Sequence, residues 1–265
     1  MEKRNQRIVR SNHHKSSRPT IDPKEIVFGT RAVMEAIRAG QEIDKLLLQK
    51  GLSNDLMLEL TKLAKDYNVP YSLVPVEKLN RVTRKNHQGA ICFLSAVSYA
   101  SLDNIVTECF QQGKVPFLLI LDRVTDVRNF GAVARSAECA GIDALIIPAK
   151  GGAQINSDAM KTSAGALNFI PVCRENNLKD TIRYLKDSGI QVVACTEKSE
   201  QLIYDIPLDQ PTAILMGSEE DGISPEYLKL ASCTAKIPLQ GNIESLNVSV
   251  AAAVVIFEGI RQRRN

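Results

Sequence analysis

The second half of the chain alternates short apolar segments with amphipathic ones, and this alternation constrains the fold more than any other feature. Short apolar runs suit strands that are buried on both faces, and the amphipathic segments have the period of helices. Such alternation predicts a parallel sheet covered by helices on both faces. The expected strands are 117–121, 144–147, 169–172, 191–196, 212–216 and 235–239, and the expected helices are 130–140, 158–164, 178–188, 225–231 and 248–261.

A smaller α/β unit precedes this region. An apolar start at 26–28 leads into a helical pattern over 30–38 that stops at Gly40, a residue type that often ends helices. Ser53 is expected to cap a second helix reaching Tyr67, and strands are expected at 43–48, 71–74 and 89–96. We therefore divide the chain into a basic disordered tail (1–25), a small α/β domain (26–98), a connector carrying a helix at 102–111 (99–115) and a large α/β domain (116–265).

Composition argues against several classes of protein. The 265 residues are 44% hydrophobic, enough for a sizeable core, yet no apolar run has the length of a membrane span. The N-terminus begins with charged residues and lacks the apolar segment of a signal peptide, while its Arg and Lys content leaves an organelle transit peptide open. Six scattered cysteines predict reduced core residues of a cytoplasmic protein. Three histidines, two of them in the tail, argue against a metal site or a histidine-dependent nucleophile.

The net charge of +3 is unevenly distributed along the chain. Residues 1–24 carry seven Lys or Arg against two Asp or Glu, hence +5, which leaves −2 for the remainder. A basic arm of this kind gains affinity for nucleic-acid phosphates by releasing counterions. A solvated terminus without function is the alternative.

Three polar loops follow apolar strands in the large domain. They contain Asn129 and Arg135, then Gly217 and Glu219, then the stretch 245–249 before the last helix. Open α/β sheets bind ligands at the carboxyl ends of their strands, so these loops predict a binding site. No GxGxxG or P-loop pattern follows any strand, which disfavours a dinucleotide-binding crevice. Taken singly, Asn129, Ser245 or Asn247 could be helix caps, Glu219 a solvated acid and Arg135 half of a surface salt bridge.

Taken together, the three segments resemble the motifs of a known family. The sequences are Asn129-Phe130-Gly131-Ala132 with Arg135-Ser136-Ala137, Gly217-Ser218-Glu219 with Gly222, and Ile237-Pro238 with Ser245-Leu246-Asn247-Val248-Ser249-Val250-Ala251. They are similar to the motifs of the SPOUT-class (TrmH-type) RNA 2′-O-ribose methyltransferases, especially the branch that methylates a guanosine in 23S large-subunit ribosomal RNA. The resemblance covers residues 26–262 and implies a knotted parallel-sheet domain after a ribosomal-protein-like substrate-binding domain. It also implies a homodimer through the knotted domain.

The resemblance assigns roles to particular residues. S-adenosyl-L-methionine (AdoMet) would be held by backbone groups of Thr196, Gly217, Ile237 and Leu246. The expected catalytic residues are Asn129, Arg135, Glu219, Ser245 and Asn247. Methyl transfer to a ribose hydroxyl needs aligned reactants and relief of negative charge on the 2′-oxygen. Arg135 is our candidate for the second role, since a guanidinium binds phosphate well and does not act as a simple base.

The small domain carries a basic cluster that the resemblance links to RNA. The expected RNA-binding residues are Arg31, Arg81, Arg84, Lys85 and His87, and a solvated charged face is the alternative. Two other functions stay open: a transfer-RNA 2′-O-methyltransferase of the same fold, and a catalytically silent RNA-binding factor in ribosome assembly. The complete set of catalytic residue types argues against the silent factor. The small domain favours ribosomal RNA, because transfer-RNA enzymes of the family lack such a domain.

Overall fold

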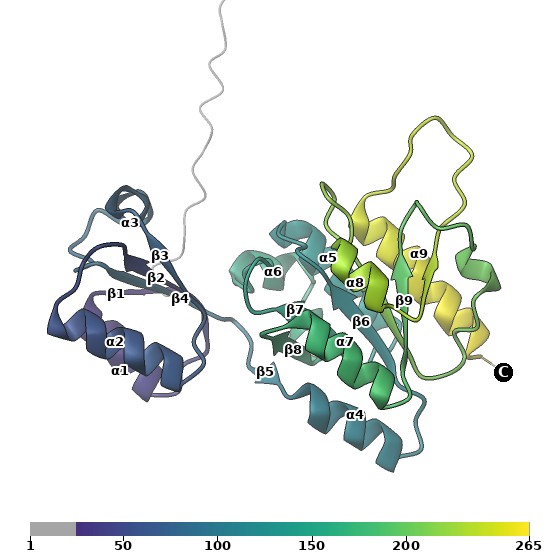
Figure 1. Cartoon of the computed structure of the whole chain (residues 1–265), viewed down its shortest axis with the longest axis horizontal. Helices are drawn as coiled ribbons and strands as arrows, with labels where there is room; N and C mark the ends of the chain where they lie inside the picture. The colour runs from purple at the N-terminus through teal and green to yellow at the C-terminus, as the bar shows by residue number, and fades with distance from the viewer. Residues whose placement is uncertain (1–24, 265) are drawn as a thin grey trace, which may run out of the picture.

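The computed structural model describes residues 25–264, which contain two separate sheets joined by a short connector (Figure 1). The first sheet has the order β1-β4-β2-β3, and its only parallel pair is β2 with β3. Its strands are β1 (Ile26–Phe28), β2 (Ile43–Gln49), β3 (Tyr71–Val74) and β4 (Ala90–Leu94). Helices α1 (Thr30–Arg38) and α2 (Asp55–Asp66) bury their apolar residues in one core with β2 and β4, and α3 (Val76–Val82) contributes to a second.

The second sheet has seven strands in the order β11-β9-β10-β6-β7-β8-β5, and every pair in it is parallel. The predicted parallel α/β architecture is confirmed. The strands are β5 (Tyr99–Ala100), β6 (Phe117–Leu121), β7 (Ala144–Pro148), β8 (Val172–Glu175), β9 (Gln191–Cys195), β10 (Thr212–Met216) and β11 (Cys233–Ala235). Strands β6 and β10 at the centre are buried along their whole length, as their unbroken apolar sequences require.

Alternate side chains of the central strand serve two different cores. Leu119 and Leu121 of β6 pack with α5 (Val127–Cys139), α6 (Ser157–Thr162) and α9 (Val248–Gln262). Leu118 and Ile120 pack on the other face with α4 (Leu102–Gln111), α7 (Leu178–Asp187) and α8 (Pro225–Leu230). Helix α9 lies very close to the sheet, since a Cβ on Gly259 would stand 2.4 Å from the Phe117 ring. This contact fixes the helix that follows the third polar loop.

Several predicted element boundaries were wrong. Residues 237–239 read as a strand in isolation, but β11 ends at Ala235 and the following residues form a loop. Helix α2 is capped by Asn54, whose side chain accepts a hydrogen bond from the Met57 N–H at 2.9 Å, and not by Ser53. Helix α3 was missed, and so was β5, a two-residue strand inside the expected connector. The strand expected at 169–172 is β8, which begins at Val172.

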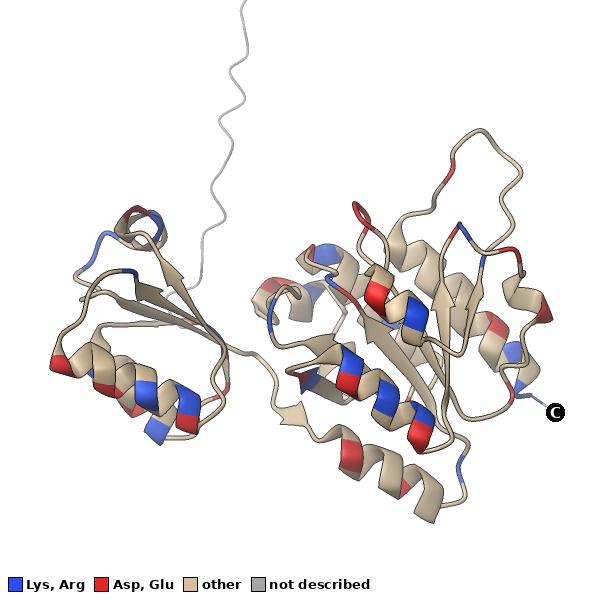
Figure 2. Ribbon diagram, viewed as in Figure 1, with Lys and Arg blue, Asp and Glu red and all other residues tan. Residues whose placement is uncertain are grey.

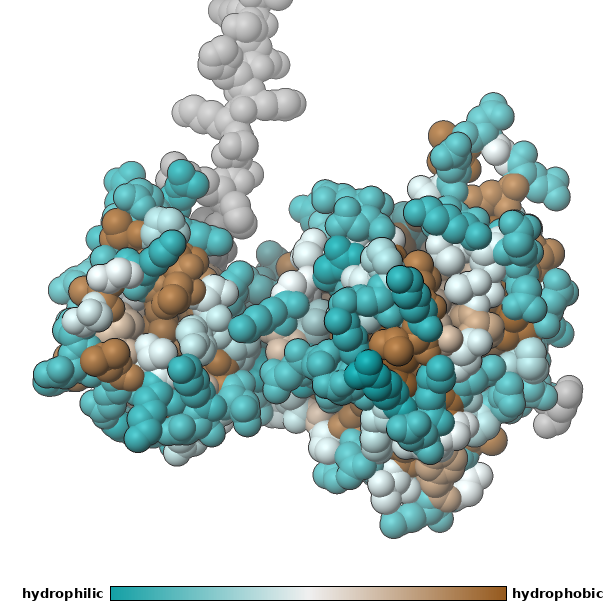
Figure 3. All heavy atoms as spheres, in the orientation of Figure 1, coloured by the Kyte–Doolittle hydropathy of each residue, from teal (hydrophilic) through white to brown (hydrophobic). Residues whose placement is uncertain are grey.

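Helix α9 is less enclosed than its apolar sequence predicts. Val250 is 50% exposed and Phe257 is 48% exposed, although Ala252, Val255 and Ile256 are buried. A helix as apolar as this one is expected to be buried on most sides, and in the single chain α9 is not. In the orientation of Figure 3, apolar side chains form separate patches on a mainly hydrophilic surface. Within residues 25–264, no helix is both long and apolar enough to span a bilayer.

Candidate active site

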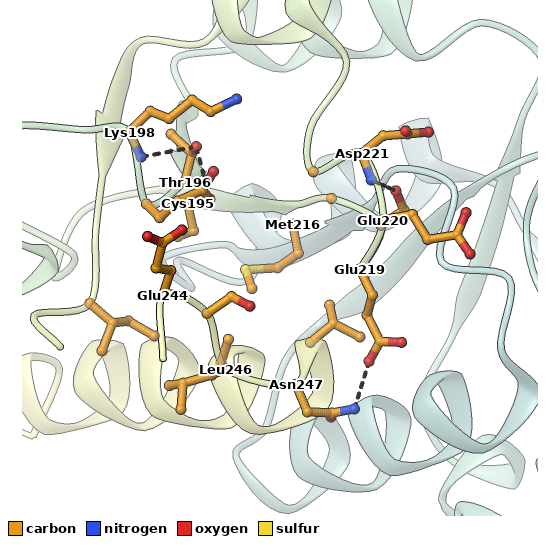
Figure 4. A pocket seen from close by; sticks show the side chains of 18 of the residues that line it. Cys195, Thr196, Lys198, Met216, Glu219, Glu220, Asp221, Glu244, Leu246 and Asn247 are labelled. Carbon is orange, nitrogen blue, oxygen red and sulfur yellow. Dashed lines mark hydrogen bonds between the residues drawn. The ribbon is translucent and has the colours of Figure 1, made fainter. Parts of the chain in front are cut away.

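The sheet order brings the polar loops together. Strands β11, β9, β10 and β6 are consecutive neighbours, so the loops at their carboxyl ends share one edge of the sheet. A cavity of about 500 Å³ lies at this edge and is lined by residues of the segments 195–198, 216–222, 235–239 and 244–251 (Figure 4). The topology thus forms a single pocket from segments that are far apart in the sequence.

Asn129, Glu219 and Asn247 meet beside this cavity, and we call them the three-loop cluster. The Asn129 amide donates to Glu219 Oε1 at 2.7 Å, and the Asn247 amide donates to the same oxygen at 2.6 Å. Asn247 Nδ2 also lies 3.1 Å from Asn129 Oδ1. One carboxylate oxygen therefore holds two amides that come from the starts of two different helices.

Local capping fixes the two asparagines. Asp126 is the N-cap of α5 and accepts from the Asn129 N–H at 2.9 Å, so Asn129 lies in the first helical turn and is not itself the cap. Asn247 is the N-cap of α9 and accepts from the Ser249 N–H at 2.9 Å. The capping alternative is thus correct for Asn247, yet its amide nitrogen remains directed at Glu219.

The other two expected catalytic residues are placed differently. Ser245 lines the cavity close to Asn247 in the chain. Arg135 is exposed on α5 and is not part of the cavity wall. Within residues 25–264 it makes no salt bridge, so the surface ion pair considered as an alternative is not found.

All four residues expected to hold the cofactor line the cavity: Thr196, Gly217, Ile237 and Leu246. Met216, Val248 and Ala251 add apolar surface, and Glu219, Glu244 and Ser218 add polar groups. Gly217 needs to be glycine, because a Cβ there would stand 2.1 Å from the Gly222 carbonyl carbon. A lining that contains both apolar and polar residues suits a ligand that combines a flat base with a charged amino-acid end. AdoMet is such a ligand, and the residues present fit it.

A second network holds the loop after β10 against β6, and sequence reasoning assigned it no role. Asp122 is 1% exposed and accepts from the Ser224 N–H at 2.8 Å and from the Ser224 hydroxyl at 2.7 Å. Arg123 donates to Asp122 at 3.1 Å and to Asp221 at 2.9 Å. The hydrogen bond that Arg123 donates to the Asp122 carboxylate raises the pKa of Arg123, which therefore stays charged. The available signal was an acidic residue directly after an entirely apolar strand.

Cys195 is the one thiol in the lining of this cavity. Burial raises its pKa to about 12, so it stays a neutral thiol at physiological pH. A neutral thiol is a poor nucleophile, which argues against covalent catalysis by this residue. In the part of the chain that the structure describes, no three His, Cys, Asp or Glu side chains gather as metal ligands do.

The expected RNA-binding residues divide into exposed and buried ones. Arg31, Arg81, Arg84 and Lys85 are exposed. In the ribbon of Figure 2, blue marks the positions of basic residues on α3 and in the loop after it. His87 is only 8% exposed, so its assignment to RNA contact was wrong. Its Nδ1 accepts from the Gly89 N–H at 3.0 Å and its Nε2 lies 3.0 Å from Asn80 Oδ1, which occupies both ring nitrogens. The tertiary fold turns this ring inward to support the β4 turn.

Comparison with known proteins gives consistent matches over most of the chain. Residues 116–257 match the SpoU rRNA Methylase family, and residues 26–100 match RNA 2'-O ribose methyltransferase substrate binding domains. A putative TrmH family tRNA/rRNA methyltransferase of Staphylococcus aureus strain MSSA476 is 34% identical over 241 residues, 91% of this chain and 97% of that protein.

Two solved structures show the same fold. The SpoU methyltransferase AviRb from Streptomyces viridochromogenes, in complex with AdoMet, matches with a TM-score of 0.57 and 24% identity, covering 90% of each chain. The A. aeolicus TrmH/SpoU tRNA modifying enzyme matches with a TM-score of 0.53 and 25% identity. That second match covers 60% of this chain and 84% of the other.

Proposed function

Because the chain belongs to the SpoU rRNA methylase family of RNA methyltransferases, we propose that it transfers a methyl group from AdoMet to the ribose 2′-hydroxyl of a guanosine in 23S large-subunit ribosomal RNA. The observation that carries this proposal is the three-loop cluster beside a cavity of about 500 Å³, whose lining includes all four residues expected to hold AdoMet. A silent RNA-binding factor would have no use for this directed hydrogen bonding between three separate loops.

One group of residues binds the methyl donor, and another orients the ribose and stabilises charge. AdoMet, when bound, supplies a methyl group activated by a sulfonium. The donor would be held by backbone groups of Thr196, Gly217, Ile237 and Leu246. The hydrogen bonds that Asp122 and Arg123 make with Ser224 and Asp221 keep the loop after β10 in place. This pre-organisation lowers the entropic cost of bringing donor and ribose together.

Orientation of the ribose and stabilisation of charge fall to polar residues of the three loops and of α5. Asn129, Glu219 and Asn247 orient the ribose, with Ser245 beside them. Arg135 binds a phosphate of the substrate and stabilises negative charge that grows on the 2′-oxygen. Its exposure on α5 and its lack of an ion pair within the described residues leave it available for this role. The proton of the 2′-hydroxyl passes to a phosphate oxygen of the RNA or to water.

Ribosomal RNA is the preferred substrate because of the N-terminal unit. That unit matches RNA substrate-binding domains, and Arg31, Arg81, Arg84 and Lys85 give it an exposed basic surface. The tRNA modifying enzyme covers too little of this chain to include such a unit together with the whole large domain. The S. aureus relative carries a name that covers both tRNA and rRNA, so tRNA is the second candidate.

The proposal includes a homodimer in the cytoplasm. The large domain (116–265), with its last segments threaded as a knot, would pair through the exposed apolar face of α9, where Val250 and Phe257 lie seven residues apart on the same side. The basic tail (1–25), the small domain (26–98) and the connector (99–115) would stand outside this interface. Residues 1–24 fall outside the described part of the chain.

The direct test is a map of ribose methylation in cells with and without the protein. We expect one 2′-O-methylguanosine of large-subunit RNA to disappear when the gene is deleted and to return on complementation. Loss of a ribose methyl group from tRNA alone would establish the second candidate. Unchanged methylation in both RNAs would contradict the proposal.

A further inference from the structure

A second cavity lies between the two sheets, and we call it the junction pocket. It measures about 300 Å³ and is lined by residues of β2 and β3 from the small unit and by residues of β5, β8 and the loop after β7 from the large one. Its charged lining consists of Asp44, Lys45, Lys150 and Arg174. Hydrophilic atoms of both units meet at the junction in Figure 3.

One wall of the junction pocket is held rigidly. The Tyr99 hydroxyl donates to Asp44, and the Ile155 N–H donates to the other oxygen of the same carboxylate at 2.7 Å. The Arg174 guanidinium lies 4.0 Å from the centroid of the Tyr99 ring and donates to the Ile43 carbonyl at 2.5 Å. Both oxygens of Asp44 are thus occupied by groups that join the two units.

A β-bulge explains how Lys45 reaches the same pocket as Asp44. Successive side chains of a regular strand point to opposite faces. The pairing of β2 with β4 shifts register between Ile43 and Lys45, and such an irregularity redirects side chains. Both Asp44 and Lys45 consequently line the pocket.

The positive charge of the junction pocket exceeds its negative charge. Neither Lys45 nor Lys150 forms a salt bridge within residues 25–264, and the carboxylate of Asp44 is already engaged by Tyr99 and Ile155. Burial, and then the charge of Lys78, lower the pKa of Lys45. The charge of Asp44 acts in the opposite direction and balances the Lys45 ammonium group only in part. An incompletely balanced ammonium group in a half-buried site costs free energy, which an anionic ligand would offset.

The junction pocket is also connected to the active site. Thr125 lines the pocket, and the next residue, Asp126, caps the helix that carries Asn129. The loop after β7 is tied to the same segment, since the Ala153 N–H donates to the Val124 carbonyl at 2.8 Å. A ligand in the pocket would therefore contact the back of the loop whose front presents the three-loop cluster.

We propose that the junction pocket binds a phosphodiester group of the RNA substrate through Lys45 and Lys150. This inference rests on the proposed function and adds a second contact point, on backbone separate from the methylated nucleotide. Two ammonium groups in a pocket of this size suit one phosphate as point charges. The contact would fix how the RNA held by the small unit is presented to the large one.

The test combines charge removal with salt dependence. Because the two lysines would neutralise one phosphate, Lys45→Gln combined with Lys150→Gln should weaken binding of a large-subunit ribosomal RNA transcript about tenfold at low salt and reduce the slope of log K against log [KCl] by about one. Lys62→Gln, which removes an exposed lysine of α2, is the matched control, and Lys45→Arg should retain the wild-type slope. Melting temperature and AdoMet affinity, measured on every variant, separate loss of the contact from loss of the fold.

The outcomes distinguish this inference from the proposed function. If the folded double variant had the RNA affinity and the salt slope of the wild type, the proposed role of the junction pocket would be overturned, whatever the methylation assay gives. A reduced slope with no methyl transfer by the wild type would support the pocket and contradict the proposed function. If inorganic phosphate, without RNA, raised the melting temperature of the wild type but not of the double variant, the result would also support an anion site. If phosphate bound tightly while the RNA affinity of the double variant equalled that of the wild type, free phosphate would be the ligand and the RNA assignment would be overturned.

Discussion

The three-loop cluster and the basic cluster of Arg81, Arg84 and Lys85 use polar residues in opposite ways. In the first, hydrogen bonds of 2.6 and 2.7 Å join residues from three distant segments on one carboxylate oxygen. In the second, the side chains are exposed and free of salt bridges within residues 25–264, and Lys85 only approaches the Phe28 ring at 5.6 Å. Aligning a reaction requires fixed geometry, whereas attracting a polyanion requires only net charge.

The largest effect on catalysis is expected from a substitution at Arg135. Arg135→Ala should lower kcat for methyl transfer about 100- to 1000-fold, because it removes a charge that acts mainly in the transition state. AdoMet affinity, measured by calorimetry, should stay the same. Arg183→Ala, which breaks an exposed ion pair with Asp180 on α7, is the control and should turn over normally. Unchanged turnover in Arg135→Ala would refute the assignment.

The next largest effect is expected on AdoMet affinity, from a substitution at Gly217 in the lining of the cavity. Gly217→Ala places a Cβ 2.1 Å from the Gly222 carbonyl carbon, so the loop must open and AdoMet affinity should fall about 100-fold. Gly241→Ala is the matched control, since a Cβ there meets nothing within 4 Å. Calorimetric titration of AdoMet into both variants makes the comparison. Equal affinities would show that this loop does not hold the donor.

Two substitutions at Asn247 can separate its role as the cap of α9 from its hydrogen bond to Glu219. Asn247→Ala should cost about 1 kcal/mol of stability through loss of the α9 cap, and it should lower kcat about tenfold through loss of the bond to Glu219. Asn247→Ser should recover the stability, because serine caps helices well, and leave kcat low. Thermal melting and single-turnover kinetics measure the two effects. If Asn247→Ser also restored kcat, Asn247 would act only as a helix cap, and its hydrogen bond to Glu219 would have no role in catalysis.

The basic cluster should show the smallest effect and the strongest dependence on salt. Replacing Arg81, Arg84 and Lys85 together by Gln should weaken RNA binding a few fold at low salt and reduce the salt slope by up to about three. Deleting residues 1–24 should act in the same direction, since the tail adds net positive charge. Anisotropy titrations across a KCl series provide the measurement. An identical slope for wild type and variant would remove that segment from RNA binding.

Local patterns predicted the elements that are self-contained. The ranges of α1, α4, β6 and β10 were predicted to the residue, because apolar runs or amphipathic periods end there at clear boundaries. Elements that depend on distant partners were not: β5 exists only because it pairs with β8, and residues 237–239 are apolar yet find no place beside β9. Burial of His87 likewise follows from Asn80 and Gly89, which no local pattern reveals.

The candidate site was predicted through motif resemblance more than through periodicity. Asn129 and Asn247 are 118 positions apart, and only the order β11-β9-β10-β6 brings their loops together. The hydrogen-bonded pair Asp122 and Arg123 was missed, although both residues directly follow the strand expected at 117–121. A charged pair next to a motif does not reveal its partner, and Ser224 lies 102 positions away.

The central claim is that three loops form one AdoMet site that delivers a methyl group to a ribose oxygen. Incubation of the protein with AdoMet and a large-subunit ribosomal RNA transcript, followed by nucleoside mass spectrometry, tests it most directly. The account predicts one 2′-O-methylguanosine that is formed by the wild type and not by Arg135→Ala. A methyl group on a base, or product that forms equally with Arg135→Ala, would contradict it.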